Sequence, residues 1–525
     1  MTPGSANGEP KKARTAAPEG SFSEEAVAGA PWMIGSKLIL FFLYLAISIL
    51  TVRGLGKEAY GVLSIGKSIV EYLFVFAALG LNAALLRFIP ELTHHRNKAG
   101  LVRFLTRSAL IQALAALLIG LALCFAAPFT THVLDPRVSA ILPWFALLLP
   151  ALLAKDYFND SLTALFLSKK VALLSLGQTL VWLALTLAVL HLGFGVPGIL
   201  AAQALSIFAA SLLAARWLIR HVSSLDWRSP PQGIGRERTF RLAIPVLLNQ
   251  AFRTLMLKYT EVFFLGLFVG TTAAGVYDLG YSVPMLVITF IPLAVQTLLA
   301  AGFNQAFTRD PASLPSLIDT SYKLLMVLSV PLAAFGVFFA PRGIELVYGA
   351  DMAASGPVAS AFCVLHLLPL ISMPLAMAIT AREKTSQTLH LMILQVLLNV
   401  GLDLLLIPRF GIPGAIGAVA LTFFLTIPLR IANVRRIIGP FPFPAGFLLR
   451  LALPCSLLAG LIYLAQPKPS LPTLLIQAAL YIGLFLASLR FLRLVSLPDL
   501  LQLRTLLPGK AARLFDRALH LPHPA

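Results

Sequence analysis

The chain of 525 residues is too apolar for a soluble protein, because 58% of its residues are hydrophobic and only 12% carry a charge, whereas globular proteins average roughly half and a quarter. Its formal charge of +19 is spread over many short segments, which excludes the single basic stripe of a nucleic-acid-binding protein. The composition predicts a protein that crosses the membrane many times and does not bind nucleic acid.

Residues 1–30 are small and polar and lack the apolar stretch of a signal peptide. We expect them to form a disordered cytoplasmic tail. Residues 495–525 mix Leu with Arg and Lys, which predicts a basic cytoplasmic tail along the anionic inner leaflet. The cysteines lie far apart within apolar runs, so neither a disulfide nor a metal site is expected.

Fourteen apolar segments are long enough to span a bilayer. They are residues 32–52, 60–88, 104–127, 141–167, 171–192, 197–220, 241–268, 274–303, 318–340, 357–380, 388–408, 412–433, 445–465 and 472–493. We predict a first lobe of six helices (31–220), a cytoplasmic linker (221–240), a second lobe of six helices (241–436) and a final pair (437–494). Basic residues concentrate in alternate loops, which predicts a multi-pass protein of the plasma (inner) membrane with both termini in the cytoplasm.

An internal repeat links the two predicted lobes. The stretch Leu55–Gly66 (LGKEAYGVLSIG) returns as Val269–Gly280 (VGTTAAGVYDLG), and Phe194–Gly198 (FGVPG) returns as Phe410–Gly414 (FGIPG). Such repeats are typical of transporters built from two related halves, in which the substrate site lies between the halves near the bilayer midplane.

One stretch near the N-terminus carries a resemblance to a known family. It contains Leu55-Gly56, Tyr60-Gly61, Gly80-Leu81 and the run LRFIPE from Leu86 to Glu91. Together with two related six-helix halves and two further helices, it resembles the polysaccharide exporters and oligosaccharide flippases of the multidrug/oligosaccharidyl-lipid/polysaccharide (MOP) superfamily. The resemblance implies an all-α, MATE-like membrane fold whose two lobes form a V and alternate between inward-open and outward-open states. Among fourteen-helix members it is most similar to the peptidoglycan-precursor flippases, whose last two helices form a groove for the lipid tail.

Polar and charged side chains within the predicted spans are the candidates for contacts with a substrate, because such groups are costly in lipid and normally face a protein interior or water. They gather in the second, fourth and seventh spans. A pyrophosphate-linked glycan needs basic groups for its charge and amides for its hydroxyls. The candidate cavity residues are Lys67, Glu71, Arg87, Lys155, Asp156, Asn159, Asn249, Arg253 and Lys258.

Three of these candidates have a second interpretation. Lys67 and Glu71 lie one helical turn apart, so they form either a self-contained ion pair or part of the cavity. Arg87 lies either at the cytoplasmic opening of the cavity or simply in the interface, where it anchors its helix. Asp160 and Gln250 are further polar residues of the fourth and seventh spans, whereas Arg253 lies too deep to reach either membrane surface.

Ion-coupled transport needs a group that binds a cation more tightly in one conformation than in another. The candidates are Glu261, Asp278, Asn399 and Asp403, with Na⁺ or H⁺ as the coupling ion and no resident cofactor or metal. The resemblance implies a cation site between the first and fifth helices of the second lobe. The position of Asp403 near Arg409 instead favours a role in capping a helix end at the membrane interface.

The sequence therefore predicts a flippase, not an enzyme, that moves a polyprenyl-pyrophosphate-linked oligosaccharide across the inner membrane by alternating access. Its partners would be this lipid-linked substrate, membrane lipids and other membrane proteins of polysaccharide assembly. The first alternative is a cation-coupled antiporter of drugs or metabolites with the same fold. The second, a membrane-bound polymerase or ligase of lipid-linked sugars, needs a catalytic loop or domain that the short predicted loops do not supply.

Overall fold

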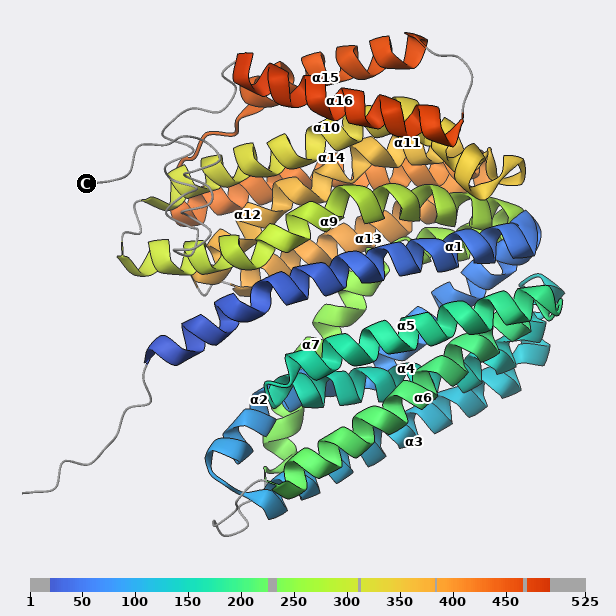
Figure 1. Ribbon diagram of the computed structural model, residues 1–525, viewed down its shortest axis with the longest axis vertical. Coiled ribbons are helices and arrows are strands. Elements are labelled where there is room, and N and C mark those ends of the chain that lie inside the picture. The colour runs from blue at the N-terminus through green and yellow to red at the C-terminus, as the bar shows by residue number, and fades with distance from the viewer. Residues whose placement is uncertain (1–18, 225–233, 310–312, 383–384, 466–469, 492–525) are drawn as a thin grey trace, which may run out of the picture.

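The computed structural model is almost wholly helical and describes residues 19–224, 234–309, 313–382, 385–465 and 470–491 (Figure 1). No strand occurs within these ranges. The long helices run roughly side by side and form two lobes, with the last two helices packed against the outside of the second lobe. The predicted all-α membrane fold is confirmed.

The first lobe contains six membrane segments. Helix α1 contains two of them, because Gly56 interrupts it with a φ of 73° and the chain reverses there; this left-handed conformation suits a residue without a Cβ. Helix α2 continues the second segment. The helices are α1 (Glu19–Ala78), α2 (Leu81–His94), α3 (Lys98–Thr130), α4 (Pro136–Ala164), α5 (Ser168–His191) and α6 (Gly195–Ser224).

The second lobe also contains six membrane segments, two of which are broken. Helices α7 and α8 form one segment, and α11 and α12 form another. The helices are α7 (Arg236–Leu255), α8 (Tyr259–Phe268), α9 (Thr271–Arg309), α10 (Leu314–Tyr348), the 3₁₀ helix η2 (Ala350–Met352), α11 (Ser355–Leu365), α12 (Leu367–Ala381), α13 (Thr385–Phe410) and α14 (Ile412–Ile438), and the final pair are α15 (Ala445–Ala465) and α16 (Leu471–Phe491).

The number of membrane segments agrees with the prediction, although few are uninterrupted. Within the described ranges, eleven stretches are long and apolar enough to cross a membrane by themselves, and one of them, Gly35–His94, contains the first two segments. The breaks at Gly80, at 256–258 and at His366 lie inside predicted spans. The break at His366 precedes Pro369, which has no N–H to donate back into a continuous helix.

The internal repeat has a direct structural meaning. Gly56 and Gly270, which occupy equivalent repeat positions, both adopt a positive φ, and so do the equivalent Gly195 and Gly411. Gly61 lies against its own repeat equivalent, Gly275: a Cβ added to Gly275 would come within 2.9 Å of the Gly61 Cα. The second membrane segment of each lobe therefore meets its counterpart where the two backbones touch, as small residues allow in membrane proteins.

Apart from the contacts of α7 described below, the two lobes touch at one end of the molecule, which we call the opposite end because it lies away from the basic end defined below. There Arg53 of α1 donates to the main-chain oxygens of Val347 (2.8 Å) and Leu346 (2.6 Å) at the end of α10. The hydroxyls of Ser48 and Tyr348 lie 3.4 Å apart beside this contact. Away from this end the lobes diverge (Figure 1).

Helix α7 is the element that joins the diverging parts. Its first half packs on the first lobe, where Gly80 approaches the main-chain oxygen of Ala243 so closely that a Cβ would overlap it. Arg238 also makes two hydrogen bonds to Glu91 of α2, at 2.7 and 3.0 Å. Its continuation, α8, packs on α9 and α13 of the second lobe.

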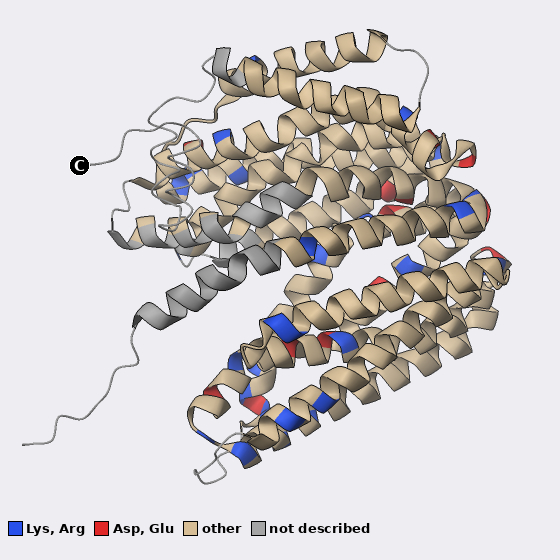
Figure 2. Ribbon diagram, viewed as in Figure 1, with Lys and Arg blue, Asp and Glu red and all other residues tan. Residues whose placement is uncertain are grey.

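Charged side chains lie at both ends of the molecule, and Lys and Arg are most numerous away from the lobe contact. Figure 2 shows Lys and Arg concentrated where α2 meets α3, where α6 ends and where α7 begins. We call this the basic end. This concentration agrees with the alternation of basic loops in the sequence.

Several predicted boundaries need correction. Helix α1 begins at Glu19, so residues 19–30 of the predicted tail are helical, as expected for a segment rich in Ala and Glu. Helix α6 extends to Ser224 and α7 begins at Arg236, so helices occupy both ends of the predicted linker. The remainder of that linker, 225–233, and the predicted tails 1–18 and 495–525 lie outside the described residues.

Candidate functional site

A network of buried polar groups connects the lobes next to the Gly61 contact. Asp278 of α9 accepts hydrogen bonds from Tyr60 (2.6 Å) and Ser64 (2.9 Å) of α1. Lys258, in the break between α7 and α8, forms an ion pair with the other carboxylate oxygen and donates to Ser282 at 2.5 Å. The side chains of Lys258 and Asp278 are only 21% and 9% exposed. Each charge has lost most of its contact with water, so its stability depends on the opposite charge of its partner.

This network corrects the expected role of two predicted residues. Asp278 was expected to couple a cation and Lys258 to contact substrate, but each is already bound to the other and to hydroxyl groups. Asp278 therefore links the lobes through Tyr60 and Ser64, and Lys258 neutralises its charge from within the second lobe. Lys67 lies close enough to Asp278 and Lys258 to interact with their charges. Glu71 likewise lies near Lys67 and Lys258. The described residues include no ion pair between Lys67 and Glu71.

The second lobe lines a large, partly open cavity of about 740 Å³, which we call the C-lobe cavity. Five of the nine methionines of the chain line it, Met256, Met285, Met373, Met377 and Met392. Methionine is flexible and polarisable, so such a wall adapts to an irregular apolar ligand.

Two guanidinium groups also line the C-lobe cavity. Arg430 of α14 donates to the side-chain oxygen of Gln395 at 3.0 Å, and neither Arg430 nor Arg253 forms an ion pair within the described ranges. An arginine that lines a cavity without a carboxylate partner is available to bind an anion.

One wall of the same cavity contains a cluster of buried acids. Asn399 of α13 donates to Glu261 of α8 (3.3 Å) and to Asp403 (3.1 Å). One oxygen of each acid, and the hydroxyl of Thr422 on the cavity wall, are buried without a hydrogen-bond partner in the described structure. Buried oxygens that lack donors are suited to a hard cation or a proton.

This cluster changes the interpretation of Asp403. The sequence favoured a helix cap beside Arg409 at the membrane interface, which is wrong, because Asp403 is fully buried while Arg409 is exposed. Glu261 belongs to the first segment of the second lobe, and Asn399 and Asp403 belong to the fifth, which is where the resemblance predicts a cation site. The three residues meet because Asn399 and Asp403 lie one turn apart on α13, facing Glu261 on α8.

A smaller pocket of about 110 Å³ lies on the first lobe and faces α7; we call it the N-lobe pocket. Its polar lining comprises Asn82, Gln112, Asp156, Tyr157, Asp160 and Gln250. Asp156 and Asp160 lie one turn apart on α4, so their side chains share one face of the helix. Gln250 replaces the predicted Asn249, which is exposed on a different face of α7.

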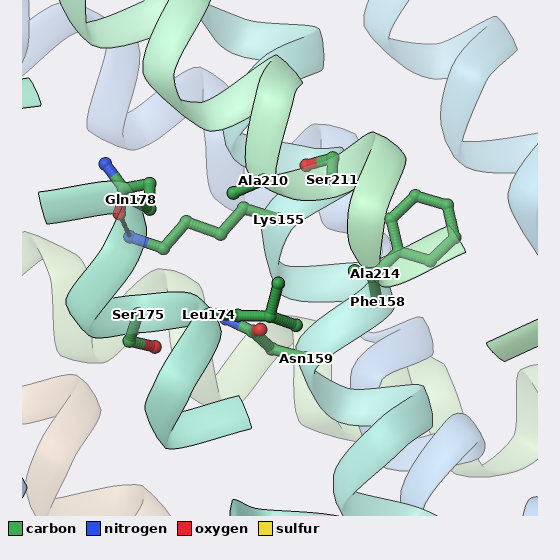
Figure 3. Close-up of a pocket in the computed structure, with 9 residues that line it drawn as sticks. All are labelled: Lys155, Phe158, Asn159, Leu174, Ser175, Gln178, Ala210, Ser211 and Ala214. Atoms are coloured by element: carbon green, nitrogen blue, oxygen red, sulfur yellow. Dashed lines mark hydrogen bonds between the residues drawn. The ribbon is translucent and has the colours of Figure 1, made fainter. Parts of the chain in front are cut away.

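Lys155 and Asn159, although also predicted for the substrate cavity, lie in a separate small pocket between α4, α5 and α6 (Figure 3). Lys155 donates to Gln178 at 3.2 Å, and Gln178 donates in turn to Ser206 at 3.2 Å. Helix geometry explains the separation, because residues 155 and 159 point about 100° away from residues 156 and 160. The sequence correctly placed polar groups on this helix but assigned both faces to one cavity.

Arg87, the weakest of the predicted contacts, is exposed near the basic end and pairs with Glu91 at 3.1 Å. The residues that sequence reasoning missed are Arg430, Gln395 and Gln112. Each was a single polar residue inside an apolar span, which is a usable signal, but only the fold shows which of these side chains reach a cavity.

The fold is similar to that of solved membrane transporters. An inward-facing multidrug resistance MATE family transporter of the MOP superfamily has a similar structure, with a TM-score of 0.65 and 18% identity over 76% of this chain and 94% of that one. The lipid II flippase MurJ in an inward closed conformation is also similar, with a TM-score of 0.65 and 14% identity over 87% of this chain and 98% of that one. The chain thus has the fold of the multi-pass transporters of the MOP superfamily.

Sequence comparison identifies the family within this class. Residues 26–299 match the model of a family described as polysaccharide biosynthesis proteins. Because that match spans more than half of the chain, the protein belongs to this family, which confirms the predicted resemblance. A probable low-salt glycan biosynthesis flippase of Haloferax volcanii is 22% identical over 174 residues, 33% of this chain and only 37% of that relative's length.

Proposed function

We propose that this protein is a flippase that moves a polyprenyl-diphosphate-linked oligosaccharide across the plasma (inner) membrane by alternating access. The observation that carries the proposal is the C-lobe cavity, where Arg253 and Arg430 lack carboxylate partners in the described structure beside an adaptable apolar wall. A diphosphate brings several negative charges, and two guanidinium groups offset them with charge-assisted hydrogen bonds.

The arrangement of the lobes supports the transport cycle. Contacts between the lobes gather at the opposite end, while the basic end is the expected cytoplasmic side by the positive-inside rule. In this conformation the substrate would enter from the cytoplasm. Release would follow when the contacts at the opposite end separate and those at the basic end form.

We expect Arg253→Ala to slow transport by about tenfold to a hundredfold, because a hydrogen bond to a charged group contributes about 1.5–3 kcal/mol. The measurement uses purified protein in liposomes and follows the appearance of a labelled polyprenyl-diphosphate oligosaccharide on the far leaflet. Lys155→Ala is the matched control. It also removes a cation from a membrane helix, but Lys155 lines the small pocket between α4, α5 and α6 and not the C-lobe cavity. Equal transport by Arg253→Ala and wild type would remove Arg253 from the site, and absence of transport by wild type would refute the flippase.

The acid cluster beside this cavity is proposed as the coupling site. Glu261, Asn399 and Asp403 present oxygens that suit Na⁺ or H⁺. We expect Asp403→Asn to make flipping insensitive to an imposed Na⁺ or H⁺ gradient while the gradient-independent rate persists. Asp319→Asn, which removes an acid paired with Lys323 on α10, should leave the gradient response intact. A full gradient response in Asp403→Asn would exclude the cluster.

A second candidate function is cation-coupled antiport of a drug or metabolite, favoured by the acids Asp156 and Asp160 that line the N-lobe pocket without a basic neighbour in its lining. Carboxylates attract cationic drugs. Gradient-driven uptake of a cationic dye into the same liposomes, with no movement of the lipid-linked glycan, would establish this alternative.

A further inference from the structure

The N-lobe pocket presents hydrogen-bond acceptors in excess. When ionised, Asp156 and Asp160 can accept hydrogen bonds but cannot donate them, and no Lys or Arg is among the residues that line the pocket. Tyr157, whose hydroxyl would otherwise supply a donor, donates instead to the main-chain oxygen of Leu105 at 2.8 Å. The donors left in the lining are the side-chain amides of Asn82 and Gln250, so the pocket favours a ligand that brings further donors.

Gln112 independently indicates the same preference. Its side-chain nitrogen donates to the main-chain oxygen of Ala78 at 3.2 Å, which fixes the orientation of the amide. Its side-chain oxygen is buried and has no donor in the described structure, although the residue lines the pocket and is only 6% exposed. A buried acceptor without a partner is costly, so a donor from a ligand would stabilise the site.

Helix α7 connects this pocket to the C-lobe cavity. Gln250 lines the N-lobe pocket, and Arg253, three residues further along the helix, lines the C-lobe cavity. Residues at this spacing are neighbours on a helix surface, about 5–6 Å apart between Cβ atoms. A ligand with its anion at Arg253 therefore has its next group beside Gln250 and the acids of α4.

We propose that the N-lobe pocket selects the glycan by charge. It accepts the hydroxyl or amino donors of the sugars next to the diphosphate and rejects sugars that carry a carboxylate. The substrate then has a fixed orientation, with its diphosphate at the arginines of the second lobe and its first sugars at the acids of the first. This inference rests on the proposed flippase function and narrows its substrate to neutral or amino-sugar glycans.

The test compares two synthetic polyprenyl diphosphates in the liposome assay, each carrying the same disaccharide except that the second sugar is glucose in one and glucuronate in the other. Wild type is expected to move the glucose lipid at least tenfold faster. Equal rates, or faster movement of the glucuronate lipid, would overturn the charge selection while leaving the flippase intact. Movement of neither lipid would overturn the proposed function and this inference with it.

The double variant Asp156→Asn/Asp160→Asn removes both charges but keeps the shape of the side chains. We expect it to reduce the preference for glucose to within about threefold. The double variant Glu237→Gln/Asp319→Asn removes two charges elsewhere and should retain the wild-type preference. A preference unchanged by the substitutions at 156 and 160 would also overturn the proposal, and the wild-type comparison decides the matter alone if that variant does not fold.

Discussion

Replacing Gly61 by Val is expected to separate the lobes at the opposite end and to slow flipping by at least tenfold. A Cβ at this position would overlap the main-chain oxygen of Thr271, which cannot rotate away as a side chain can. Overpacking typically costs about 1–3 kcal/mol, and 1.4 kcal/mol corresponds to a tenfold shift in population. The conformation with the lobes in contact would therefore lose most of its population.

The separation can be measured as the distance between spin labels on cysteines introduced at Lys57 and Ala350, two exposed positions at the opposite end. Cys124, the exposed native cysteine, is first replaced by Ser. The matched control is Gly177→Val, because a Cβ at Gly177 of α5 meets open space. An unchanged distance and flipping rate in Gly61→Val would refute the close contact.

The second large effect is expected for Asp278→Ala. The substitution leaves the charge of Lys258 without its partner in a largely buried position and leaves the hydroxyls of Tyr60 and Ser64 without their acceptor. Breaking a buried ion pair by removing one partner typically costs about 3–5 kcal/mol. We therefore expect a pronounced fall in the melting temperature of the protein in lipid nanodiscs.

The controls separate burial from charge. Glu237→Ala breaks an ion pair whose side chains are 79% and 85% exposed, and exposed pairs contribute only about 0–1 kcal/mol. Replacing both partners, as in Lys258→Met/Asp278→Leu, leaves no unpaired charge and should lose less stability than Asp278→Ala. If Asp278→Ala and Glu237→Ala had the same melting temperature, the Lys258–Asp278 pair would not stabilise the lobe contact.

Much of the fold followed from the sequence because hydropathy and the repeat are strong signals. The equivalence of Gly56 with Gly270 and of Gly195 with Gly411 reflects a backbone requirement, a positive φ at a reversal of the chain. Such a requirement restricts the residue type directly, so one sequence reveals it. The interruption at His366 was missed because the helices on both sides of it, α11 and α12, are similarly apolar.

The candidate sites were harder to predict. A polar residue within a span signals a protein interior, and this was correct for Arg253, Glu261 and Asp278. It does not tell which interior the side chain faces, so Lys155 was grouped with Asp156, and Lys258 was assigned to substrate when it pairs with Asp278. Partners distant in the sequence decide these assignments, and hydropathy contains no information about them.

The contact of Arg53 with α10 affects whether the link between the lobes can be detected from related sequences. Residues that touch through their side chains tend to change together among relatives, and such covariation reveals contacts. Here the acceptors are main-chain oxygens of Leu346 and Val347, which every amino acid supplies. Positions 346 and 347 are thus free to drift without compensation at 53, and this link between the lobes would leave no covariation signal in an alignment.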